Sequence, residues 1–248
     1  IGEDACADEF IADFGRRAYR RPLTEAEIAE LRGVYQTAKA TDFASGIRVV
    51  VSTALQSPFF LYHVEQADDG QGTLAKLNGY EVASRLSYFL WSSMPDTALF
   101  DAAASGALDN GEGVVAEAER MLADPKAADT IASFHLQWLD LSDFSELEKD
   151  PGTFPGFDEA LKEAMAQETA RFADFVIREG DAKLSTLLTA SYSFPSGPLL
   201  TLYGAEAPTD PSAPVELDPA ERSGLLTHAS VLARHAHGNQ TSPVARGV

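Results

Sequence analysis

Apolar residues recur three and four positions apart along nearly the whole chain, which is the spacing of one face of an α-helix. The first such stretch runs from Phe10 to Ala18 and ends before Pro22. Alternation of apolar and polar positions, which is typical of a half-buried strand, is confined at most to a short hairpin near 191–200. We therefore expect an all-α fold, a multi-helix orthogonal bundle in which a small N-terminal helical subdomain packs on a larger helical domain.

Residues that favour helix starts divide this pattern into separate helices. Thr24 and Glu27 match the capping box, while Asn78, Asp96 and Asp158 are suited to accept hydrogen bonds as N-caps. After the first helix, we expect helices over about 25–40, 43–56, 79–91, 97–107, 112–122, 127–141, 158–179 and 219–235.

The loops suggest three parts. Asp68-Asp-Gly-Gln-Gly72 predicts an internal loop, and the proline-rich segment 191–219 predicts a longer one. We expect an N-terminal module at 1–67, a main helical domain at 77–204, and the truncated start of a C-terminal module at 219–248. Because the chain begins with Ile1 and not Met, we expect it to be a piece of a longer precursor.

Composition narrows the class of protein. The 248 residues are 45% hydrophobic, enough for a sizeable core, and carry a formal net charge of -19. A surface this acidic repels phosphate backbones and anionic lipids, so nucleic acid and bare membrane are poor partners. The sequence contains no apolar run long enough to span a bilayer and no signal peptide.

A single cysteine, Cys6, limits the redox chemistry of the chain. It excludes covalent haem attachment through Cys-x-x-Cys-His and a cysteine zinc cluster within this chain. Cys6 is either a free thiol or half of a bridge to a residue outside this chain.

Three charged residues, Arg17, Arg85 and Glu168, fall where the helical spacing expects an apolar side chain. A buried charge is costly unless it is paired and hydrogen-bonded. We therefore expect a structural ion pair between Glu168 and either Arg85 or Arg17. The alternative is that Glu168 is catalytic, a general acid or base lining a cleft.

Candidate metal ligands are few. If the last helix ends near His235, then His235 and His237 lie two apart in extended backbone and share a face, which would make half of a metal site. The alternative is that they bind the last carbonyl groups of the helix. Asp68 and Asp69 lack the spaced carboxylates of a calcium-binding EF-hand loop, so a solvated turn is the better interpretation.

Several segments, read in order, resemble one family. They are Phe14-Gly-Arg-Arg-Ala-Tyr-Arg-Arg-Pro-Leu23, Ala83-Ser-Arg-Leu-Ser-Tyr-Phe-Leu-Trp91, Phe134-His-Leu-Gln-Trp-Leu139, Ala190-Ser-Tyr-Ser-Phe194, Leu202-Tyr-Gly204, Arg222-Ser-Gly-Leu-Leu-Thr-His-Ala-Ser230 and Thr241-Ser-Pro-Val-Ala-Arg-Gly247. The chain thereby resembles the bacterial family catalogued as domain of unknown function 1592, found in planctomycetes and myxobacteria, together with parts of its neighbouring modules.

The resemblance implies an exported protein, periplasmic, cell-surface or extracellular. Larger members of the family carry c-type cytochrome or carbohydrate-binding modules, which implies redox or polysaccharide work and a haem or transition metal supplied in part by a partner. The expected partners are another segment or chain of the same precursor and a c-type cytochrome module. Since members carry a cysteine shortly downstream, the resemblance also implies that Cys6 pairs with it.

Three functions follow as alternatives, because the sequence holds no recognised catalytic motif. The chain is a helical module of an exported, cytochrome-associated protein, or a non-catalytic interaction or scaffold domain, or a metal-assisted hydrolase with Glu168 as its base. Whether it is an enzyme at all stays open at this point.

Overall fold

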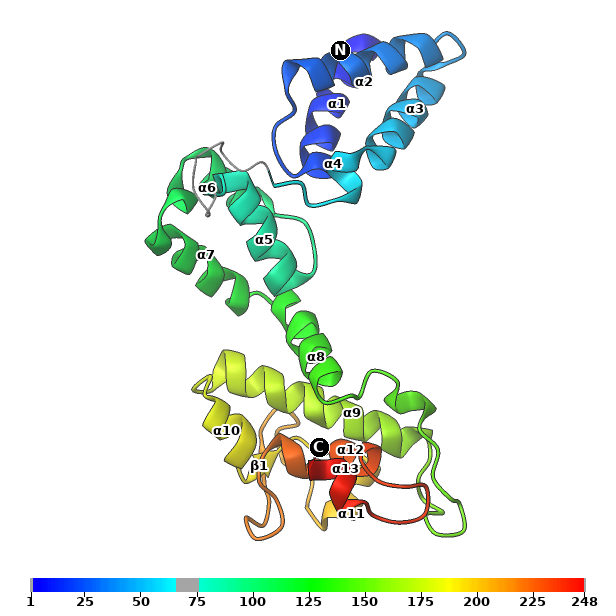
Figure 1. Ribbon diagram of the computed structural model, residues 1–248, viewed down its shortest axis with the longest axis vertical. Coiled ribbons are helices and arrows are strands. Elements are labelled where there is room, and N and C mark those ends of the chain that lie inside the picture. The colour runs from blue at the N-terminus through cyan, green and yellow to red at the C-terminus, as the bar shows by residue number, and fades with distance from the viewer. Residues whose placement is uncertain (1, 66–75, 248) are drawn as a thin grey trace. The chain divides into compact units, whose positions relative to one another are not determined.

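The computed structural model describes residues 2–65 and 76–247. The regular secondary structure of these residues is almost entirely helical, which confirms the all-α prediction (Figure 1). The chain divides into two compact units, unit 1 at Ile1–Met121 and unit 2 at Leu122–Val248. The segment expected to form the main domain, 77–204, therefore contributes to both units. The predicted loop Asp68–Gly72, which was considered as a calcium site, lies outside the described residues.

Unit 1 consists of helices. They are α1 (Glu3–Tyr19), α2 (Glu25–Ala38), α3 (Phe43–Gln56), α4 (Pro58–Leu61), α5 (Gly79–Trp91), α6 (Thr97–Ala104), the 3-10 turn η1 (Ala107–Asp109) and α7 (Gly111–Ala123). The predicted capping box is present at Thr24, and Asn78 and Asp96 cap α5 and α6 as expected.

The first three helices of unit 1 pack around one apolar cluster. Ile11, Leu31 and Val50, one from each helix, are at most 2% exposed. The helices α2 and α3 come close because α3 carries Gly46, where a Cβ would lie 2.6 Å from the ring of Tyr35. Burial of these apolar side chains is the main source of stability for this part of unit 1.

The helix α5 buries a face that the apolar pattern did not predict. Its buried residues are Gly79, Ala83, Ser87 and Trp91. A Cβ on Gly79 would lie 3.0 Å from the backbone oxygen of Ala103 in α6, so small residues let the two helices approach closely. Arg85 and Phe89 consequently face outward, with Phe89 76% exposed, and the expectation that Arg85 faces the core is not met.

Unit 2 is also helical, with two short strands. Its elements are α8 (Lys126–Trp138), η2 (Phe144–Glu146), α9 (Glu159–Asp174), the π-helical turn η3 (Phe175–Glu179), α10 (Leu184–Thr189), β1 (Tyr192–Ser193), α11 (Pro198–Tyr203), β2 (Val215–Glu216), η4 (Leu225–Thr227), α12 (Ala229–Arg234) and α13 (Pro243–Gly247). The helix α9 is central and packs against α8, α11 and α12 (Figure 1).

Two local predictions for unit 2 were wrong. The strand β1 pairs antiparallel with the distant β2, not within a hairpin at 191–200. The last long helix does not start at Pro219. Gly224 has φ +59° and donates its N–H to the Ala190 oxygen, so the chain turns there and α12 begins only at Ala229. Backbone with a positive φ is readily accessible to glycine, which lets the chain turn at this point.

Candidate functional site

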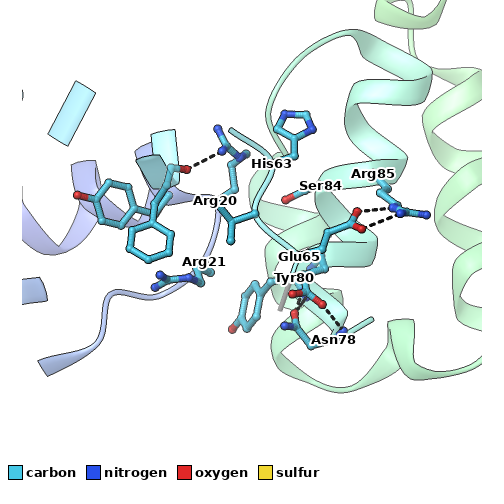
Figure 2. Close-up of a pocket in the computed structure, with 12 residues that line it drawn as sticks. Arg20, Arg21, His63, Glu65, Asn78, Tyr80, Ser84 and Arg85 are labelled. Atoms are coloured by element: carbon cyan, nitrogen blue, oxygen red, sulfur yellow. Dashed lines mark hydrogen bonds and ion pairs between the residues drawn. The ribbon is translucent and has the colours of Figure 1, made fainter. Parts of the chain in front are cut away.

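A small hollow in unit 1 is lined by the end of α1, the segment after α4 and the first half of α5 (Figure 2). Its arginines already have partners. Arg20 donates to the backbone oxygens of Phe59 and Tyr62 at 2.6 and 2.9 Å, and Arg85 donates to both carboxylate oxygens of Glu65. The free volume is about 60 Å³, room for little more than water. The arginine contacts around this hollow hold α1, α5 and the segment after α4 together. A site large enough for a ligand lies in unit 2.

Unit 2 contains an open groove of about 810 Å³, the size of a site for a small organic ligand. Its walls are the connector 149–157, α9, α11, α12 and the segment that leads into α13. The lining residues are Lys149, Thr153, Phe154, Pro155, Gly156, Phe157, Leu161, Met165, Pro198, Thr201, Leu202, Arg222, Ala229, Leu232, Ala233, Ala236, His237, Gln240, Thr241 and Arg246. Most of these side chains are apolar.

The charges along this groove are all of one sign. Lys149, Arg222 and Arg246 line it, and no aspartate or glutamate is among the described residues that do so. The chain as a whole carries 38 acidic residues and a net charge of -19. A groove that excludes carboxylates from such an acidic protein is suited to hold an anion.

One wall of the groove is held together by three hydrogen bonds between two segments of the chain. The ammonium of Lys149 donates to the backbone oxygens of Ala236 and His237 at 3.0 and 3.1 Å. The N–H of Asp150 donates to the oxygen of Gly238 at 2.8 Å. These bonds hold the connector 149–157 against the segment 236–238 and occupy two of the three donors of the Lys149 ammonium.

Arg222 is anchored differently. Its Cζ lies 4.0 Å from the centroid of the Tyr203 ring, and one of its nitrogens donates to the oxygen of Thr227 at 2.8 Å. Within the part of the chain that the structure describes, no carboxylate forms an ion pair with Arg222. The guanidinium is therefore held in place while keeping donors available for a ligand.

Beneath Arg222 lies a buried carboxyl group. Glu168 on α9 is 1% exposed, as its place on an apolar face predicts. Ser193 donates to its Oε1 at 2.7 Å and Tyr203 to its Oε2 at 2.8 Å. Burial raises the pKa of Glu168 to about 7, against the opposing effects of these two hydroxyls and of the Arg222 charge.

A buried histidine extends this network. The Nε2 atom of His228 lies 3.3 Å from the Ser193 hydroxyl, and its Nδ1 atom lies 3.1 Å from the hydroxyl of Thr169. Thr169 in turn lies 2.7 Å from the hydroxyl of Ser230. Burial, assisted by the charge of Arg222, lowers the pKa of His228 to about 3, so the imidazole is neutral near pH 7.

The proton count sets the direction of these bonds. The single proton of Ser193 goes to ionised Glu168, so His228 must donate from Nε2 to Ser193. Its Nδ1 then accepts from Thr169. No buried side-chain polar atom among the described residues lacks a partner.

The ion pair expected between Glu168 and Arg85 or Arg17 has no contact to support it. Arg85 is paired with Glu65, Arg17 is exposed on α1, and both oxygens of Glu168 accept hydrogen bonds from hydroxyls. The need for partners was predicted, but the partners are polar hydroxyls in place of an arginine.

The metal and disulfide predictions also stay predictions. His235 lies at the end of α12 with Nε2 3.2 Å from the Leu139 oxygen, and His237 lines the groove. Among the described residues, no group of three or more histidine, cysteine or acidic side chains is placed to hold a metal ion. Cys6 is an exposed free thiol on α1.

Sequence reasoning did not single out Ser193, Tyr203, Arg222 or Ser230 as site residues. A signal was present, since all four lie in the segments that carried the family resemblance: 190–194, 202–204 and 222–230. The structure assembles these three segments around Glu168 and His228.

Comparisons with known proteins cover two of these three segments, 190–194 and 202–204. Residues 77–205 match the profile of a family described as PSD4, protein of unknown function (DUF1592), and residues 6–65 match PSD5, protein of unknown function (DUF1595). No curated protein and no solved structure matches the chain. None of the described helices combines the length and apolar character needed to cross a membrane.

Proposed function

The chain belongs to the DUF1592 family of unknown function, and on the geometry of unit 2 we propose that it is a non-catalytic binding module whose groove takes up a small anion with an apolar body. This is the interaction alternative considered above, with a ligand class assigned to it.

The observation that carries this proposal is the charge of the groove. Lys149, Arg222 and Arg246 line it without a neighbouring carboxylate among the described lining residues, although the chain carries a net charge of -19. An anion that binds there meets Arg222 at the site while the rest of the surface repels it. The groove thus concentrates the attraction at one place.

The apolar side chains on the floor and walls of the groove indicate that its ligand has an apolar part. Leu161, Met165 and Ala229 are each less than 10% exposed and form the floor, while Phe154 and Leu202 stand partly exposed on the walls. A ligand that covers these exposed side chains removes apolar surface from water, which contributes about 25 cal/mol for each Å² buried. An anion without an apolar body would leave these apolar side chains exposed to water.

Binding is favoured over turnover because the groups suited to chemistry lie beneath the groove. Glu168 and Ser193 are each 1% exposed, and neither lines the groove. A general base must reach the proton that it removes. This burial counts against the metal-assisted hydrolase alternative, which needs Glu168 as its base. The alternative of an exported, cytochrome-associated module and the expected partners stay predictions on which these contacts do not bear.

The test is calorimetric titration of the chain with 1-decanesulfonate, compared with 1-decanol, which has the same apolar body and no charge. Two variants locate the site: Leu202→Glu places a negative charge on the groove wall, and Leu184→Glu places one at a similarly exposed leucine of α10. We expect Leu202→Glu to weaken sulfonate binding at least about tenfold, or about 1.4 kcal/mol, and Leu184→Glu to bind as the wild type does.

Two outcomes would overturn the proposal. Equal affinity for the alcohol and the sulfonate would remove the charge recognition. Equal effects of the two leucine variants, or no binding of either compound, would remove the groove as the site.

A further inference from the structure

Resting on the proposed function, we propose that the groove takes up its anion together with a proton, which is stored on Glu168 beneath the site. Arg222 and Tyr203 form the physical connection between the two.

Of the three cations that line the groove, Arg222 is the one placed to hold the anionic group. The ammonium of Lys149 is engaged by two backbone oxygens, and Arg246 lies exposed on the last helix, α13. Arg222 is fixed by the Tyr203 ring and by the Thr227 oxygen, and it has no carboxylate partner in the described part of the chain. A fixed guanidinium with free donors binds sulfonate or carboxylate oxygens well.

The same guanidinium acts on Glu168. Arg222 lies on the ring of Tyr203, and the hydroxyl of Tyr203 donates to Glu168 at 2.8 Å. The positive charge of Arg222 lowers the pKa of this carboxyl, partly offsetting the effect of burial. An anion bound to Arg222 neutralises that charge, so the carboxylate loses support and takes up a proton from solvent.

The buried network can accept this proton without leaving a polar group unpaired. When Glu168 becomes protonated, it donates to Ser193, and Ser193 donates to Nε2 of His228. The ring proton of His228 is then on Nδ1 and is donated to Thr169, whose own proton goes to the Met165 oxygen 3.3 Å away. The net change is one proton added, with the three hydrogen bonds that join Glu168, Ser193, His228 and Thr169 reversed in direction.

Other ionisable groups around the site do not store this proton. Burial lowers the pKa of His228 to about 3 and raises that of Tyr203, so both stay neutral near pH 7. Burial and Arg234 lower the pKa of Lys149, and two backbone oxygens accept hydrogen bonds from its ammonium. His237 also lines the groove, and the Glu168→Gln variant distinguishes any proton that it takes up from the proton stored on Glu168.

The test uses 1-decanesulfonate, because its own charge does not change with pH. Calorimetric titrations at pH 7 in bis-Tris and in Tris, two cationic buffers that differ in ionisation enthalpy, give the number of protons taken up per ligand. If the anion raises the pKa of Glu168 by about one unit, uptake is about 0.4 proton and affinity falls about fivefold from pH 6 to pH 8.

Variants show which side chain takes up the proton. Glu168→Gln should bind with no proton uptake and no dependence on pH, whereas Glu179→Gln should keep both; Glu179 is half-exposed and pairs with Arg171. Binding without proton uptake by the wild type would overturn this inference and leave the proposed function standing. No binding at any pH would overturn the proposed function itself.

A second measurement avoids any folding defect of the Glu168 variant. In the wild type, the side-chain ¹³C shift of Glu168 and the ¹⁵N shifts of His228 report the protonation state and the tautomer. We expect sulfonate to move Glu168 toward its protonated shift and the His228 ring proton from Nε2 to Nδ1. Unchanged shifts at saturation would contradict the coupling.

Discussion

The guanidinium of Arg222 and the phenol of Tyr203 are stacked, with 4.0 Å between the Arg222 Cζ and the ring centroid. The other end of the same phenol donates to Glu168 and accepts the N–H of Ala229. Tyr203 therefore joins the groove, the buried carboxyl and the first turn of α12. Each of these three contacts can be tested separately.

Tyr203→Phe should destabilise unit 2 by about 1–3 kcal/mol, because the N–H of Ala229 loses its acceptor in a buried place. Urea unfolding measures this cost. The matched control is Tyr192→Phe, since the Tyr192 hydroxyl makes no hydrogen bond within the described residues, and its effect should stay within about 0.5 kcal/mol. Similar losses in both variants would show that the hydroxyl contacts of Tyr203 contribute little.

The stability of unit 2 should change little between pH 4.5 and 6.5, because two buried groups act in opposite directions. Burial raises the pKa of Glu168 from 4.5 to about 7, so its contribution to the free energy of unfolding is full below pH 4.5 and is lost as pH rises toward 7. His228 has its pKa lowered from 6.5 to about 3, so its contribution is full above pH 6.5 and is lost as pH falls.

Single variants should reveal the two opposing dependences of stability on pH. Across these two pH units, Glu168→Gln should gain stability with rising pH and His228→Asn should lose it, each by about 2–3 kcal/mol relative to the wild type. Urea unfolding at several pH values gives the slopes. Parallel curves for all three proteins would mean that neither group titrates differently in the folded chain.

Gly224→Ala should be among the most damaging single changes in unit 2. A Cβ there would lie 2.3 Å from the Leu187 oxygen, and φ is +59°. Gly204 also has a positive φ, +63°, but with ψ +28° it lies in the left-handed helical region, and a Cβ there would meet nothing within 4 Å. We expect about 1–2 kcal/mol for Gly204→Ala, from backbone strain alone, and a clearly larger loss for Gly224→Ala in thermal or urea unfolding. Equal costs would show that the backbone at 187–188 moves freely.

Arg20→Lys should loosen the end of α4. Arg20 is 6% exposed and its planar guanidinium binds the oxygens of Phe59, Phe60 and Tyr62, which a single ammonium does not match. Hydrogen exchange followed by mass spectrometry should show faster exchange over 57–65, while Arg17→Lys, at an exposed position of α1, should leave it unchanged. Protection that survives Arg20→Lys would assign the bracing to apolar packing.

Local features of the sequence predicted much of the fold. The caps at Thr24, Asn78, Asp96 and Asp158 all appear, since each depends on residues at most three positions away. The burial of Glu168 was also predictable, because helical periodicity placed it on an apolar face.

The partners of Glu168 could not be predicted in this way. Ser193 and Tyr203 reach it across 25 and 35 residues of sequence, through loops whose course depends on tertiary contacts such as that of Gly224 with Leu187. The predicted orientation of Arg85 was wrong for a related reason. Close packing of small residues on α5 outweighed the apolar pattern that would have turned Arg85 inward.

The bonds from Lys149 and Asp150 to residues 236–238 have a consequence for how this groove can change over evolutionary time. Two surface loops, far apart in the chain, share three hydrogen bonds and form one wall. A residue inserted into either loop would shift the register of its donors or acceptors and break the match. Variation in the length of one loop should therefore be accompanied by variation in the other, so that ligand preference in related chains changes by paired replacement of both loops.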